Sequence, residues 1–158
     1  MLYSVLKTLH LLAIIVWIGG MVFAHFFLRP SLGAFESAVR VRLMHAVLGR
    51  FFSAVLAAMA VTLVSGLWMI GQVAKQMVQA GAHFSMPLEW TIMATLGILM
   101  MLIFGHIRFV LYQRLSRVAQ AADWPAGAAV LAQIRTWVLV NLSLGVLIVL
   151  VTLLGVPR

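Results

Sequence analysis

The sequence predicts an all-α, polytopic membrane protein: a bundle of four transmembrane helices with both chain ends on the outer side. Three observations predict it. Of 158 residues, 65% are hydrophobic and 9% are charged, whereas soluble domains are roughly 45–50% apolar and about 25% charged. The apolar residues form four blocks of about 20 residues, the length with which an α-helix crosses a bilayer. The basic residues concentrate in two of the connections.

The four blocks are expected to form a single membrane domain, residues 1–158, with spans at about 4–28, 50–74, 88–112 and 134–156. None of the uninterrupted apolar runs contains Asp, Glu, Lys or Arg, and these runs are Leu9–Leu28, Phe51–Ile70, Trp90–Ile107 and Thr136–Val156. A helix pairs its own backbone N–H and C=O groups, which hydrocarbon cannot do for it. Each run is therefore expected to be a transmembrane helix.

Charge in the connections predicts the orientation. Eight of the eleven basic residues lie around the first and third connections, namely Arg29, Arg40, Arg42, Arg50, Arg108, Arg114, Arg117 and Arg135. The positive-inside rule places these connections in the cytoplasm, so both termini and the 75–89 connection face outward. Helical spacing in 37–48 and 110–122 predicts helices that extend beyond the membrane. Arg29-Pro30 is expected to end the first helix.

The same charges exclude some functions. The basic residues divide between two connections instead of forming one basic and aromatic surface, which argues against nucleic-acid binding and favours contact with anionic lipid headgroups. The chain has no cysteine, so it has no disulfide or thiolate metal site. Its three carboxylates all lie outside the middle of the spans, and no nucleophile, base and acid pattern is visible. The sequence favours a protein that is not an enzyme.

Histidines near the ends of the first and third spans suggest a cofactor site. Phe23-Ala24-His25 and Phe104-Gly105-His106 each precede a basic connection and then an arginine, Arg50 or Arg135. A parallel repeat of two hairpins would place His25 and His106 at similar depth. The two imidazoles would suit a b-type haem, with Arg29, Arg50, Arg108 and Arg135 at the same membrane face pairing its propionates. Alternatively, both histidines are simply hydrated at the interface.

A second candidate site lies near the start of the first span. Lys7 and His10 are three residues apart and share one helix face, and His10 lies about 9 Å inside the outer end. His10 would serve as a metal or haem ligand or as a proton-handling group, with Lys7 supplying a nearby positive charge. The alternative is an interhelical hydrogen bond from a neutral histidine, with Lys7 extending to the interface.

Methionine and histidine in the outward connection suggest a copper site. His83 and Met86 are three residues apart, and imidazole with thioether is a soft donor set that suits Cu(I). Ordinary packing of methionine is the alternative. Within the fourth span, the polar Asn141 lies four residues before Gly145, a spacing that predicts close packing between helices.

Several segments resemble the short members of the copper resistance protein D (CopD) family. The first two carry the patterns K-x2-H and W-x-G-G, and the segments are Lys7–Leu12, Val16–Met21, Leu48–Phe52, Phe104–His106, Ala132–Arg135 and Asn141–Gly145. The resemblance implies a multi-pass protein of the bacterial inner membrane that takes part in copper uptake or homeostasis. It also implies that His10 is functional.

The first helix is also similar to that of the HemJ type of protoporphyrinogen oxidase, which is associated with haem. That group is expected to have a lysine in the third helix, and here no lysine follows Lys75. Three functions therefore remain open. They are a copper-handling membrane protein, a b-type haem redox protein, and a structural subunit of a homo-oligomer or membrane partner with no ligand of its own.

Overall fold

Four long helical rods make up the computed structural model, which describes residues 1–81, 83 and 85–154. The first rod joins α1 (Leu2–Val22), the π-helical η1 (Phe23–Leu28), α2 (Arg29–Ser31) and the short η2 (Leu32–Ala34); the second is α3 (Ser37–Gln79). The third joins α4 (Leu88–His106), the π-helical η3 (Ile107–Leu111) and α5 (Tyr112–Gln120), and the fourth is α6 (Trp124–Leu154). The described residues contain no strand.

All four rods are long and apolar enough to cross a membrane. Large apolar side chains also cover much of their outer surface; Val64 is 67% exposed and Leu102 is 66% exposed. Exposing such a surface to water costs about 25 cal/mol of free energy per Å² of apolar area, whereas lipid tails solvate it without that cost. The prediction of a polytopic four-helix membrane protein is therefore confirmed, while its orientation in the bilayer stays a prediction.

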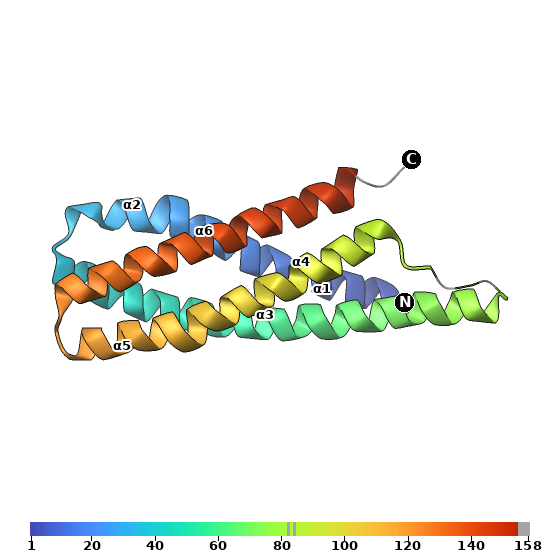
Figure 1. The fold of residues 1–158 in the computed structure, drawn as a ribbon, viewed down its shortest axis with the longest axis horizontal. Coiled ribbons are helices and arrows are strands. Elements are labelled where there is room, and N and C mark those ends of the chain that lie inside the picture. Colours follow the sequence, from blue (N-terminus) through green and yellow to red (C-terminus); the bar gives the residue numbers. More distant parts are fainter. Residues whose placement is uncertain (82, 84, 155–158) are drawn as a thin grey trace.

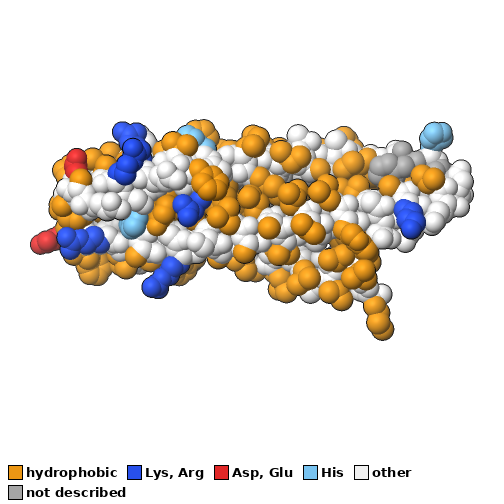
Figure 2. Space-filling model, turned by 90° about the horizontal axis from the view of Figure 1, so that it is seen from below, with side chains coloured by type: hydrophobic (Ala, Val, Ile, Leu, Met, Phe, Trp, Pro, Cys, Tyr) orange, Lys and Arg blue, Asp and Glu red, His pale blue; other side chains and the backbone are white. Residues whose placement is uncertain are grey.

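The rods run side by side in an elongated bundle (Figure 1). The N-terminus, the end of α6 and the connection between α3 and α4 lie at one end, and the other two connections lie at the opposite end. On the face drawn in Figure 2, most Lys and Arg side chains gather toward that opposite end, while orange apolar side chains cover the middle. We call the half of the bundle with the eight connection arginines the arginine-rich half.

The predicted helical extensions are confirmed at the arginine-rich half, since α3 begins at Ser37 and α5 reaches Gln120. The prediction that Arg29-Pro30 ends the first helix is wrong, because the helical rod continues to Ala34. Proline lacks an N–H and its ring clashes with the carbonyl four residues earlier in a regular α-helix. The wider π-helical turn η1 lies directly before Pro30 and relieves that clash.

The core consists of side chains from all four rods, and aromatic rings run through it. Trp17 of α1 meets Phe104 of α4 edge-on at 6.1 Å between ring centroids. Phe52 of α3, 1% exposed, meets Phe104 at 5.6 Å and Tyr112 of α5 at 5.5 Å. Aromatic pairs at such spacings contribute about 0.5–1.5 kcal/mol each beyond the burial of their area. Phe52 therefore links the second rod to the third, and Phe104 continues the aromatic contacts to Trp17 of the first rod.

Candidate functional site

His10 lies between α1 and α3, where it is bonded to a serine. His10 Nδ1 is 2.9 Å from Ser65 Oγ, and Ser65 Oγ donates its hydrogen to the carbonyl of Val61 at 2.5 Å. A serine hydroxyl carries one hydrogen, so His10 Nδ1–H must donate to Ser65 Oγ. A neutral imidazole protonated at Nδ1 keeps a free lone pair on Nε2. His10 can therefore bind a metal ion or accept a proton through Nε2.

Helix packing explains why His10 reaches Ser65. His10 shares its face of α1 with Trp17 and Met21, which are buried in the core. Gly66 of α3 leaves space for the imidazole, since a Cβ there would lie 3.3 Å from His10 Cε1. Ser65 itself is only 2% exposed. The hydrogen bond is thus shielded from competing water, and it fixes the orientation of the imidazole, as partners of metal-binding histidines do.

Two polar residues were not predicted from the sequence as members of this site. Ser65 and Thr62 lie on the α3 face toward His10, and Thr62 Oγ1 is buried with no hydrogen-bond partner among the described residues. The only signal was the spacing of Thr62, Ser65 and Gly66, three small residues within about one turn of an apolar helix. Lys7 is exposed, and its role as a positive charge near His10 stays a prediction.

His83 and Met86 lie in a different place from His10. His83 is exposed and Met86 is half-buried in the connection after α3. Ser65 lies fourteen residues before the end of α3 at Gln79, which is about 21 Å along the helix axis at 1.5 Å per residue. One metal ion cannot bridge that length. Within the described part of the chain, no group of three or more His, Cys, Asp or Glu residues could hold a metal ion.

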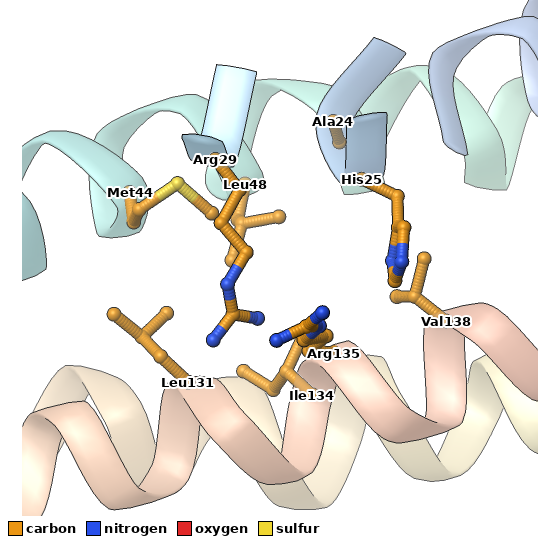
Figure 3. Close-up of a pocket in the computed structure, with 9 residues that line it drawn as sticks. All are labelled: Ala24, His25, Arg29, Met44, Leu48, Leu131, Ile134, Arg135 and Val138. Atoms are coloured by element: carbon orange, nitrogen blue, oxygen red, sulfur yellow. The ribbon is translucent and has the colours of Figure 1, made fainter. Parts of the chain in front are cut away.

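His25 and Arg135 meet at a small cavity in the arginine-rich half. Its volume is about 30 Å³, enough for one or two water molecules. Its three polar lining residues are His25, Arg29 and Arg135, and apolar side chains from α3 and α6 line the rest. Figure 3 shows the Arg29 and Arg135 guanidinium groups facing each other across this cavity. The cavity thus brings together His25, Arg29 and Arg135, three of the residues that the sequence groups at the proposed cofactor site, whose function stays a prediction.

His106 and Arg50 lie outside this cavity, and both are exposed. The His106 ring packs on Trp137 at 5.4 Å, whereas the His25 ring packs on its neighbour Phe26 at 4.7 Å. In the part of the chain that the structure describes, no aromatic contact or hydrogen bond joins the two histidines. A haem held by both needs them on opposite sides of one iron. Two such ligands do not touch each other, so joint haem ligation by His25 and His106 stays a prediction.

His45 forms a second histidine–serine pair, in the arginine-rich half. His45 Nε2–H donates to Ser116 Oγ at 2.8 Å, because Ser116 Oγ gives its own hydrogen to the carbonyl of Tyr112 at 3.1 Å. The Tyr112 ring stacks on His45 at 5.1 Å, and its hydroxyl donates to the His45 carbonyl at 3.2 Å. These contacts tie α3 to α5 and serve the packing of the two helices.

Asn141 of α6 is 1% exposed, and its Oδ1 has no hydrogen-bond partner among the described residues. A buried polar atom without a partner costs about 1–3 kcal/mol, so Asn141→Leu, a near-isosteric change, should raise the free energy of unfolding by about 1 kcal/mol. Unfolding in mixed detergent micelles would measure this. If Asn141→Leu lowers stability instead, Oδ1 has a partner that stabilises the bundle. A variant that gains stability but loses copper handling would assign Asn141 to function.

Comparison with known families identifies the chain. The family model for copper resistance protein D matches residues 45–154, which include α4 to α6 and most of α3. The first helix with His10 lies outside the matched range. No curated protein and no solved structure matches the chain. Since the match covers more than half of a chain that forms four membrane-spanning helices, this protein belongs to the copper resistance protein D (CopD) family.

Proposed function

We propose that this protein takes part in copper homeostasis by binding copper ions within the membrane, in the course of their transport or sequestration. Membership of the CopD family points to copper resistance. The observation that carries the proposal is the state of His10: its Nδ1–H is held by Ser65, so Nε2 is free to bind a metal ion. Imidazole in this form is a common metal ligand, and the hydrogen bond to Ser65 fixes its orientation, as such bonds do for metal-binding histidines.

The proposal has two binding places near the same end of the bundle. His83 and Met86 lie in the connection after α3, where imidazole and thioether suit Cu(I). His10 lies further inside, between α1 and α3. An ion captured at the connection would pass to His10, which is the order that transport or sequestration requires. The charge distribution supports an outward orientation of this end in a bacterial inner membrane.

Copper binding by the purified protein tests the proposal. The protein in a non-ionic detergent would be titrated with Cu(I) in the presence of a chromophoric Cu(I) chelator, and we expect it to withdraw copper from the chelator. Cells that lack the protein should differ from the parent strain in the copper concentration that stops their growth. If the protein withdraws no copper and copper tolerance is unchanged, the proposal is wrong.

An absorption spectrum of the same sample separates copper from haem. The copper proposal expects no Soret band, because that band belongs to haem and Cu(I), with its filled d shell, has none. A Soret band that is lost in both His25→Ala and His106→Ala would overturn the copper proposal in favour of a haem redox protein. Both variants should first be shown to retain the helix content of the parent protein.

A further inference from the structure

Arg29 and Arg135 form an unusual pair, because their guanidinium groups face each other with no negative charge between them (Figure 3). Both line the 30 Å³ cavity, where Arg29 is half-buried and Arg135 is exposed. Two like charges repel, and the repulsion grows as burial lowers the effective dielectric constant. Such a pair is stable when an anion lies between its members, since a guanidinium binds phosphate or carboxylate through two parallel hydrogen bonds.

The chain itself supplies no anion for this pair in the described residues. Only two acids belong to the arginine-rich half, Glu36 and Asp123. Asp123 Oδ1 accepts a hydrogen bond from the backbone N–H of Ala126 at 3.0 Å, which caps the start of α6. Glu36 is exposed just before α3, and no arginine donates a hydrogen bond to it there. An anion at this site must therefore come from outside the chain.

Three of the other six arginines in this half have a partner within the protein, whereas Arg50, Arg114 and Arg117 have no such contact among the described residues. Arg40 Nη2 donates to Ser37 Oγ at 3.2 Å. Arg42 lies over the Trp124 ring at 4.8 Å, and Arg108 lies over the Tyr112 ring at 5.1 Å. No such contact is recorded for Arg29 or Arg135 in the described part of the chain. What sets Arg29 and Arg135 apart is that their guanidinium groups face each other at one cavity. Unspecific attraction of basic residues to a membrane does not require that arrangement.

The residues around the arginine pair suit a lipid, with its charged headgroup and its acyl chains. The cavity is lined on its other sides by apolar residues, among them Met44, Leu48 and Val138. Phe26 and Phe27, on the helix just before Arg29, are 56% and 60% exposed and would contact acyl chains. We propose that Arg29 and Arg135 bind the phosphate group of an anionic phospholipid, with the phosphate between the two guanidinium groups. Basic pockets between transmembrane helices bind such headgroups.

Thermal unfolding of the detergent-purified protein with added lipid tests this. Phosphatidylglycerol, phosphatidylcholine and inorganic phosphate would be added in separate titrations, and we expect only phosphatidylglycerol to raise the unfolding temperature. Arg29→Gln and Arg135→Gln should each weaken the apparent affinity for phosphatidylglycerol about fivefold. Arg29→Lys should weaken it less, because it keeps the charge but loses the two-pronged geometry. The increment within each variant is the readout, so a less stable variant remains informative.

Arg114→Gln is the matched control. Arg114 is exposed in α5 of the same half, and its replacement removes the same charge, so its affinity for phosphatidylglycerol should stay within about twofold of the parent. An equal loss in Arg114→Gln would show diffuse attraction to the surface and overturn the proposal. Equal stabilisation by inorganic phosphate would identify a free anion and overturn the assignment to a lipid. The test does not depend on copper, so it can fail while the copper proposal stands.

Discussion

Phe52→Ala is expected to lower the free energy of unfolding by about 3–5 kcal/mol, the range for phenylalanine truncated in a core. Phe52 is 1% exposed and its ring contacts Phe104 of α4 and Tyr112 of α5. Its removal leaves a cavity where α3, α4 and α5 meet, and it also removes two edge-on aromatic contacts. Unfolding in mixed detergent micelles, followed by circular dichroism, would measure the loss.

Phe109→Ala is the control for that measurement. It makes the same chemical change in η3, but Phe109 is 56% exposed on the outer surface, where lipid or detergent fills the space that the ring leaves. The expected loss is below about 1 kcal/mol, as for other surface positions. Equal losses in the two variants would show that the packing around Phe52 is not the core of the bundle.

His10→Ala is expected to weaken the affinity for Cu(I) by at least about tenfold, since even partners of metal ligands change affinity 10–100-fold when they are removed. The variant removes the Nε2 lone pair proposed to bind copper. Ser65→Ala should give a smaller loss, because it keeps the imidazole but removes the hydrogen bond that orients it. Both would be measured by competition with the chromophoric chelator, in samples shown to keep their helix content.

His45→Ala is the matched control for His10→Ala. His45 is also half-buried and also donates a hydrogen bond to a serine, Ser116, but it lies in the arginine-rich half and is tied to Tyr112. Its removal should destabilise the contact between α3 and α5 and leave Cu(I) affinity unchanged. If His10→Ala and His45→Ala lower the affinity equally, the loss follows from weakened folding and His10 is not a copper ligand.

The four helices were readable from sequence because a bilayer imposes one simple requirement. A span must be about 20 residues long and apolar, and it must pair its own backbone N–H and C=O groups. Four runs, such as Phe51–Ile70, meet the conditions of length and composition. The extensions were readable as well, since residues 37–48 alternate arginine and apolar positions with helical spacing. The continuation through Pro30 was not, because the π-helical turn before it has no distinct signature in the residues.

The candidate site was readable only in part. His10 was singled out because four apolar helices have little reason to carry a histidine. Its partner Ser65 lies 55 residues away, and a serine in an apolar helix is an ordinary residue, so only its spacing with Thr62 and Gly66 distinguished it in the sequence. The tautomer of His10 follows from that partner. Likewise, the sequence grouped Arg135 with His25 and His106 by its place in the chain, but only the structure shows that its guanidinium group faces Arg29.

The sequence by itself determined that this protein lies in a lipid bilayer, how many spans it has and how unequally its charges are distributed. These depend on composition and on periodicity along one helix, which are local. Only the tertiary structure decided which polar groups meet: His10 with Ser65, His45 with Ser116, and Arg29 with Arg135. Those pairings depend on the rotation and register of one helix against another. Nearly uniform apolar surfaces leave rotation and register undetermined until the side chains of all four helices pack together.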